Sequence, residues 1–258
     1  MRATTSAPLP PLSPMLERLA AERATGALIR DGGTLYVTEG RVVHAESPLT
    51  PGIDVLLTRG GVLHPGGWWE AVAQAGAEQQ VARYLVDSGS VPGGALELCH
   101  LGALYDAAFF ALAPTRNPAR FRYGVSHWIG PVRPVPVDAV QRETFRRREL
   151  LDRIWPETET DSAPLVRTPR PVDAPVPPAR RRVLDLVDGV RTASDIAQEL
   201  GGSAFHVLVG LRRLAAAGLV ETVPEPPSAS PGRITLPEVA ADPDVALLYR
   251  LRDALEAL

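Results

Sequence analysis

The stretch that decides the fold of the first half of the chain is Gly26-Ala-Leu-Ile-Arg-Asp-Gly-Gly-Thr-Leu-Tyr-Val-Thr-Glu-Gly-Arg-Val-Val-His-Ala45. It contains three short apolar runs, which we expect to be strands at 27–30, 34–38 and 41–45. Asp31-Gly32-Gly33 separates the first two runs, and Glu39-Gly40 separates the second from the third. Glycine supplies the positive φ that tight hairpins require. The stretch therefore predicts a small antiparallel meander.

Helical patterns surround this meander. Before it, Leu16, Leu19 and Ala20 recur at the spacing of one helix face. After it, the sequence predicts a short strand at 121–125 and helices over about 52–59, 66–76, 78–87, 93–113 and 137–155. We therefore expect an α+β domain over residues 15–155, preceded by a proline-rich, disordered tail at 1–14.

The meander also carries a family resemblance. Residues 26–29, 33–37 and 39–45 resemble the hairpin signature of the PATAN family (PatA N-terminal-like domains). The helix before them and the closing helix after Val135-Pro136-Val137 are similar to that family as well. The resemblance covers about 15–155. It implies a bacterial signalling or interaction module that binds a protein partner or forms a dimer, and it brings no catalytic residues.

The prolines mark a division of the chain. Of the 26 prolines, seven lie between residues 156 and 178, where no apolar periodicity is present. Proline removes a backbone donor and cannot continue a helix, so such a segment prefers extended geometry. The sequence thus predicts a flexible linker at 156–178 between two domains.

The part that follows, 179–258, shows a helix-turn-helix pattern. We expect helices at 180–187, 193–200 and 204–217, and then a strand at 219–223. Thr192 and Asp195 form a capping-box pair at the start of the second helix, and Ser203 is the expected cap of the third. This order is similar to the winged-helix domains of transcriptional regulators. The wing would comprise 219–223 and 233–236, and an amphipathic helix at about 245–258 would close the chain.

A DNA-binding winged helix needs cationic side chains on its outer face. We predict that Ser203, His206, Arg212 and Arg213 on the third helix face the major groove. Arg180, Arg181 and Arg233 would hold the phosphate backbone. However, residues 180–224 contain six arginines and five acidic residues. This small excess of positive charge is weak evidence for a DNA-binding domain. The alternative is a cytoplasmic signalling adaptor whose two domains bind proteins.

Composition narrows the function classes further. The chain has 258 residues and a net charge of -3, which excludes a strongly basic nucleic-acid coating protein. It has no apolar run of membrane-spanning length and no signal-peptide pattern, so we expect a cytoplasmic protein without a membrane partner. Cys99 is the one cysteine, which excludes an internal disulfide. At least one of Trp68 and Trp69 is expected in the core.

Enzyme signals are absent from the sequence pattern. Cys99 and His100 are neighbours on a predicted helix and therefore point apart. His44, His64 and His127 share no metal-ligand spacing, and the glycine pairs fit no phosphate-binding fingerprint. We therefore predict no catalytic residue, no metal and no cofactor. The sequence favours a non-enzymatic transcriptional regulator, with the adaptor as its rival.

Overall fold

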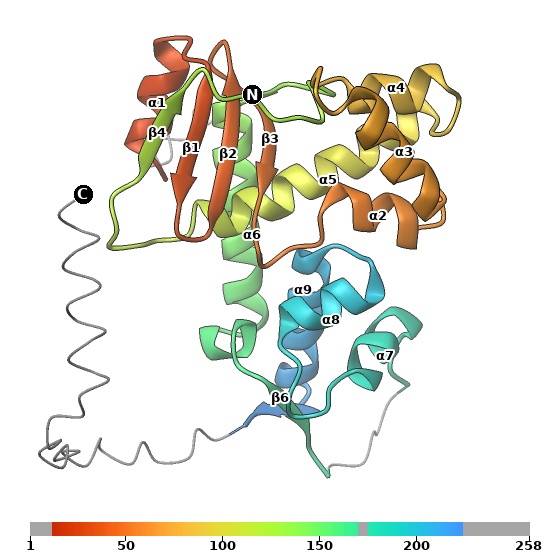
Figure 1. Ribbon diagram of the computed structural model, residues 1–258. Coiled ribbons are helices and arrows are strands. Elements are labelled where there is room, and N and C mark those ends of the chain that lie inside the picture. The colour runs from red at the N-terminus through yellow and green to blue at the C-terminus, as the bar shows by residue number, and fades with distance from the viewer. Residues whose placement is uncertain (1–11, 170–174, 224–258) are drawn as a thin grey trace, which may run out of the picture. The chain divides into compact units, whose positions relative to one another are not determined.

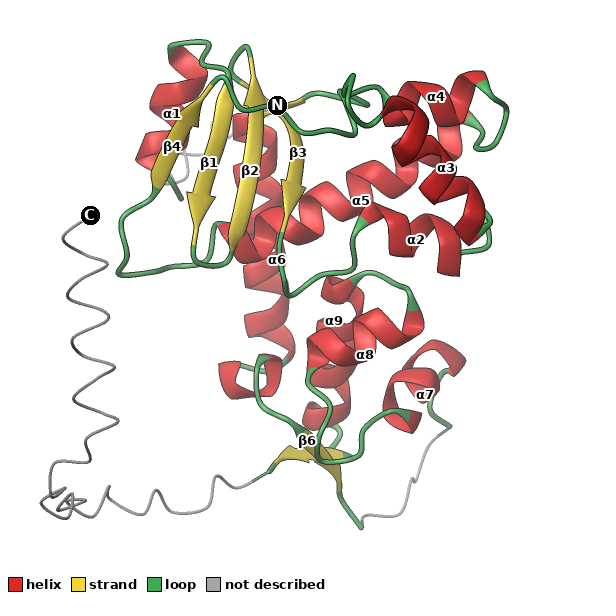
Figure 2. Ribbon diagram, in the orientation of Figure 1, coloured by secondary structure: helices red, strands yellow, loops and turns green. Residues whose placement is uncertain are grey.

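The computed structural model describes residues 12–169 and 175–223, which belong to one compact unit (Figure 1). The chain is a mixed α+β protein, as the sequence predicts. Its main sheet has five strands in the order β4-β1-β2-β3-β5, and every pair is antiparallel (Figure 2). The expected strand at 233–236, the expected helix at 245–258 and residues 1–11 lie outside the described part.

The predicted meander is confirmed. It consists of β1 (Gly26–Arg30), β2 (Gly33–Thr38) and β3 (Arg41–Glu46), and Leu35 of β2 lies opposite Leu28 of β1 and Ala45 of β3. The turn between β2 and β3 places Glu39 at φ 48° and Gly40 at φ 76°. Two successive positive φ values give the twist that a two-residue hairpin needs.

The sheet is completed by distant segments. The strand β4 (Arg120–Tyr123) pairs with β1, and the two-residue β5 (Val135–Pro136) pairs with β3. Helices α1 (Pro14–Ala21), α5 (Gly93–Ala111) and α6 (Val137–Ile154) pack against the sheet (Figure 1). The shared core contains Leu19 of α1, Leu28, Leu35, Leu104 of α5 and Val140 of α6, all fully buried.

A second core lies beside the sheet. It is formed by α2 (Ile53–Arg59), α3 (Pro65–Ala75) and α4 (Val81–Asp87), which pack on the first half of α5 around Leu57, Trp68 and Leu85. These helices match the predicted ranges within a few residues. The expectation that at least one of the two tryptophans is in the core is confirmed, because Trp68 is 5% exposed.

The last described helices are α7 (Pro178–Asp185), α8 (Ala193–Leu200) and α9 (Ala204–Ala216), followed by β7 (Val220–Thr222). The capping box of Thr192 and Asp195 is present, and Ser203 caps α9 by accepting a hydrogen bond from the His206 N–H. Gly201 ends α8 in the left-handed conformation. Phe205, Leu208 and Leu211 of α9 form the centre of this third core.

The structure corrects the linker prediction for much of 156–178. This segment contains a 3-10 helix, η1 (Thr158–Asp161), and a strand, β6 (Leu165–Arg167). The strand β6 pairs antiparallel with β7, and Leu165 is 2% exposed in the core of α7–α9. Pro164 precedes β6 and Pro169 follows it, so the residues between these two prolines are free to pair as a strand. Residues 170–174 of the expected linker lie outside the described ranges.

The Gly40 turn gives a stability prediction. Replacing Gly40 by Ala strains a positive φ, which costs about 1–3 kcal/mol, and it also drives a Cβ against the Ala20 carbonyl oxygen of α1. Gly61 has a similar φ of 72° but no atom within 4 Å of its Cβ position, so Gly61→Ala reports the strain alone. We expect Gly40→Ala to lower the free energy of unfolding more than Gly61→Ala in urea denaturation. Equal losses would contradict the contact between this turn and α1.

Candidate functional site

The amino-terminal end of α9 is the part of a helix-turn-helix that usually meets DNA, and here it is covered. The Asp106 carboxylate of α5 accepts a hydrogen bond from the Phe205 N–H at 3.5 Å. This amide belongs to the first turn of α9 and has no partner inside the helix, so Asp106 acts as a cap supplied by another helix. Asp106 is only 2% exposed. The start of α9 therefore faces protein rather than solvent at this position.

A buried ion pair holds Asp106 in place. The Arg147 guanidinium of α6 donates to Asp106 at 2.5 Å and to Glu143 at 2.8 Å. The same guanidinium lies 4.5 Å from the centre of the Phe205 ring, which is a cation–π distance. One arginine of α6 thus contacts both the carboxylate that caps α9 and an aromatic ring of α9.

The turn between α8 and α9 makes a second set of contacts. At the carboxyl end of α2, Arg59 donates to the Glu199 carbonyl oxygen at 2.6 Å, and Gln198 of α8 donates to the Thr50 carbonyl oxygen at 3.2 Å. A Cβ at Gly201 would collide with the Arg59 side chain, so the backbone of this turn packs closely against that side chain. The turn is therefore packed on α2 and on the loop before it.

The prediction that Arg212 lies on the outer face of α9 is wrong. Its side chain is 2% exposed and donates to both carboxylate oxygens of Asp161, at 2.8 and 2.6 Å, and to the Trp155 carbonyl oxygen. Asp152 lies 3.6 Å away and adds a second negative charge. The segment from Trp155 to η1 covers this side of α9, which removes Arg212 from any nucleic-acid face.

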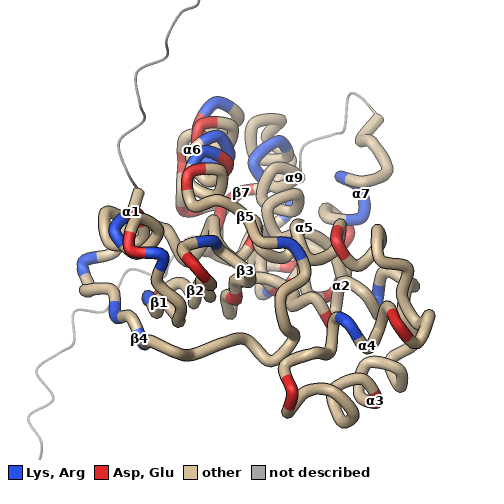
Figure 3. Tube along the Cα trace, turned by 90° about the horizontal axis from the view of Figure 1, so that it is seen from above, with Lys and Arg blue, Asp and Glu red and all other residues tan. Residues whose placement is uncertain are grey.

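The other predicted contact residues have mixed positions. Arg213, His206 and Arg181 are exposed, and Arg180 is half-buried. Ser203 is engaged as the cap of α9. Arg233 lies outside the described ranges. Basic residues are thus present on both α7 and α9, which pack through Val183 beside Gly210 (Figure 3).

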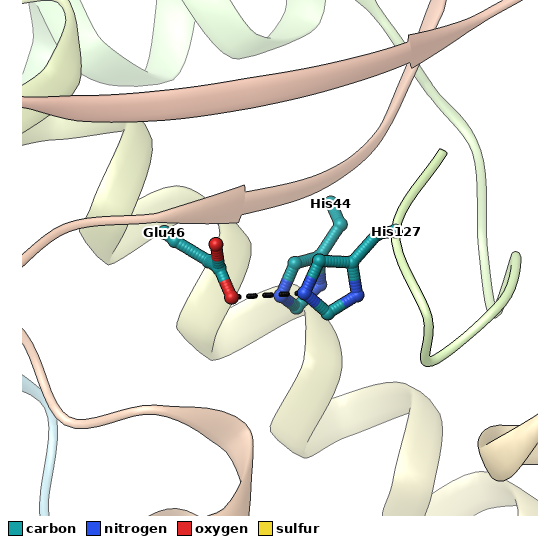
Figure 4. A group of neighbouring side chains, drawn as sticks. All are labelled: His44, Glu46 and His127. Atoms are coloured by element: carbon teal, nitrogen blue, oxygen red, sulfur yellow. Dashed lines mark hydrogen bonds and ion pairs between the residues drawn. The ribbon is translucent and has the colours of Figure 1, made fainter. Parts of the chain in front are cut away.

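A cluster of histidines, which the sequence analysis missed, lies between the sheet and α5. His44 and Glu46 come from β3, His100 from α5, and His127 from the loop after β4. The rings of His44 and His127 are stacked with centroids 3.9 Å apart (Figure 4), and His100 stacks on His44 with centroids 5.5 Å apart. His64 is not part of this cluster, because it caps α3. The members are too far apart in sequence to give a spacing signal.

We tested whether this cluster fits a metal. Ligand atoms of His44, Glu46 and His127 all lie within 4.8 Å of one another. However, His127 Nδ1 accepts the Ile129 N–H at 3.2 Å, so its Nε2 carries the proton that Glu46 accepts at 2.8 Å. In addition, ring nitrogens bind metals in the ring plane, whereas these rings are stacked face to face. The arrangement fits a hydrogen-bonded imidazole stack, and we place no metal in it.

Burial controls the protonation of the stack. Burial holds the pKa of His44 well below its usual value, and the neighbouring His127 and His100 act in the same direction. Burial also lowers the pKa of His100, whose Nε2 donates to the Val43 carbonyl oxygen at 2.8 Å. The adjacent Cys99 thiol has a pKa raised by burial, which disfavours a reactive thiolate. Burial therefore favours the neutral imidazoles of His44 and His100.

These directions predict how stability depends on pH. The unfolded chain takes up protons on His44 and His100 as the pH falls below about 6.5, whereas the folded chain resists them. The free energy of unfolding should therefore be highest above about pH 6.5 and fall as the pH drops below it, by up to about 1.4 kcal/mol per pH unit for each proton. Denaturant titrations at several pH values measure this slope.

The matched variants for this experiment are His44→Phe and His206→Gln. The first removes a buried imidazole but keeps an aromatic ring, so we expect a shallower slope. The second replaces an exposed histidine of α9 outside the stack, and we expect the wild-type slope. A His44→Phe protein with an unchanged slope would show that His44 does not carry the effect.

Comparison with known proteins adds no relative. No family model matches the chain, and neither a curated protein nor a solved structure does. The resemblance of 26–45 to PATAN hairpins therefore stays a prediction. Within residues 12–169 and 175–223, none of the helices combines the length and the apolar character that crossing a membrane requires.

Proposed function

We propose that this chain is a non-enzymatic, cytoplasmic signalling adaptor, with a PATAN-like domain over 15–155 and a winged-helix domain over 179–258 that both bind proteins. The observation that carries the proposal is the covered start of α9. A DNA reader presents this end of its second helix to base edges. Here Asp106 and Arg147 contact Phe205 in the first turn of α9, although His206 of that turn is exposed, and Arg59 donates to Glu199 near the end of α8.

Charge supports the same reading. Arg212 is buried in an ion pair with Asp161, so its guanidinium cannot contact a phosphate. The remaining five arginines over 180–223 are matched by five acidic residues. A DNA-binding face is expected to carry a clear excess of positive charge. A surface of balanced charge suits protein contacts better.

The helices beside the sheet offer an anchor for such a partner. Trp69 of α3 is 70% exposed, although its neighbour Trp68 is buried against Trp128 with ring centroids 5.7 Å apart. The buried Trp68 holds α3 in place, so the exposed Trp69 is presented from a fixed helix. Tryptophan is among the residues most enriched in interface hot spots. We therefore assign Trp69 to the protein-binding surface of the adaptor.

A second candidate is the DNA-binding regulator. It is favoured by the exposure of His206, Arg213 and Arg181 on two packed helices. In this reading Ser203 and Arg233 would join them, and Arg180 would contact the phosphate backbone. The start of α9 would have to be uncovered before the helix could enter a groove.

DNA binding by the full chain separates the two candidates. We measure binding to a mixed-sequence duplex by fluorescence anisotropy at low salt. We expect no binding that depends on Arg213, so Arg213→Ala should give the same signal as wild type. Phosphate contacts would instead give affinity that falls steeply with salt, with a slope that becomes shallower by about one unit when one contact is lost. Wild-type binding that Arg213→Ala abolishes without changing the melting temperature would contradict the adaptor and favour the regulator.

A fold control belongs in the same experiment. Leu208 is 1% exposed in the core of α9, so Leu208→Ala should cost about 2–5 kcal/mol through lost packing. Its binding loss would come with a lower melting temperature, which Arg213→Ala should not show.

The adaptor also makes a positive prediction about Trp69. A photo-crosslinker placed at Glu70, its exposed neighbour on α3, should give one discrete product in the native cell. Adding Trp69→Ser should remove that product, because the anchor is lost, while the melting temperature stays unchanged. A product that persists in the Trp69→Ser protein would contradict the assignment of this surface.

A further inference from the structure

A cavity of about 520 Å³ lies where α5 and α6 meet α8 and α9. Its walls are mainly apolar, with Phe109 and Phe110 from α5, Leu151 from α6, Ala193 from α8 and Leu208 from α9. The volume lies within the range of small-molecule sites, and apolar walls with a few polar groups are typical of them. The residues of the histidine stack do not line it.

The two acidic groups of the cavity share one arginine. Asp161 and Asp152 line it, and both pair with the buried Arg212, at 2.6 and 3.6 Å. These two carboxylates therefore do not call for a cationic ligand. The remaining arginine in the wall is attracted by Asp152, but the two side chains form no ion pair.

That arginine is Arg148 of α6. It donates one hydrogen bond, to the Leu112 carbonyl oxygen at 2.7 Å, and among residues 12–169 and 175–223 no carboxylate lies within ion-pair distance of it. Arg30 of β1 stands close enough to repel it and donates to the neighbouring Ala113 carbonyl oxygen at 3.3 Å. The Nε and Nη1 atoms of Arg30 are buried without a partner in the described structure. The partly desolvated guanidinium of Arg148 thus lines the apolar cavity, and that of Arg30 lies near it outside the lining.

We propose that this cavity binds a monocarboxylate with an apolar body, of the medium-chain fatty-acid type. The carboxylate pairs with Arg148, which presents donors in the fork geometry that suits it. The hydrocarbon lies between the phenyl rings of α5 and the leucines of α6 and α9. A single negative charge suits the site better than a phosphate, because Asp152 and Asp161 would repel a second one.

The inference goes beyond the proposed function and does not depend on it. It has a consequence for the contact between the two halves of the described structure. The walls come from α5 and α6 on one side and from α8 and α9 on the other, so a bound ligand stabilises their packing by mass action. The ligand would make the docked arrangement of α9 more resistant to opening.

The test uses the full chain and decanoate labelled with ¹³C at its carboxyl carbon, kept below its micelle concentration. We expect one saturable, shifted carboxyl resonance and a rise in melting temperature. Arg148→Gln should weaken decanoate binding by about tenfold or more, while the uncharged 1-decanol should bind as it does to wild type. Arg148→Lys, which keeps the charge, should recover part of the affinity.

Two further variants make the result specific. Arg153→Gln changes an arginine of the same helix that does not line the cavity, and it should bind decanoate like wild type. Ala113→Phe fills part of the cavity and should weaken decanoate and 1-decanol alike. No saturable binding to folded wild type, equal losses in Arg148→Gln and Arg153→Gln, or unchanged binding in Ala113→Phe would each overturn the proposal.

Discussion

The packing of α9 against α5 and α6 depends on the ion pair between Asp106 and Arg147. It joins α5 to α6, and the same two residues contact the backbone and the ring of Phe205 at the start of α9. A buried pair contributes little net stability, but removing one partner leaves an uncompensated charge and costs about 3–5 kcal/mol. The main effect of the pair is therefore to fix the position of α9 against α5 and α6, and its net contribution to stability is small. Because the capping carboxylate comes from α5, α9 cannot leave without exposing an unpaired amide and a buried charge.

This constraint explains why the helix-turn-helix pattern alone is a poor guide to function. The local signals are all present: the capping box at Thr192, the cap at Ser203 and the left-handed Gly201. They specify the helices and the turn, but they do not specify what covers them. The tertiary contacts of Asp106 and Arg59 cover Phe205 and the end of α8, while His206 and Arg213 stay exposed. The proposed function therefore depends on which residues of α8 and α9 remain exposed.

Much of the fold could be predicted from the sequence, because its signals are local. The glycines at 33 and 40 separate alternating apolar runs, and the strands and helices of 14–154 follow within a few residues, apart from the two-residue β5. The missed features all depend on partners distant in sequence. Arg212 is buried by Asp161, 51 positions earlier, and β6 becomes a strand only because β7 pairs with it. The stack of His44 and His127 joins residues that no helical or strand period connects.

The central claim is that the start of α9 is docked on α5 in the full chain. Amide hydrogen exchange at Phe205 tests it most directly, because a first-turn amide has no partner within its own helix. The account predicts that this amide is protected in wild type, and that Asp106→Ala lowers its protection while amides in the middle of α9 stay protected. Exchange of the wild-type Phe205 amide at the rate of an exposed amide would contradict the account.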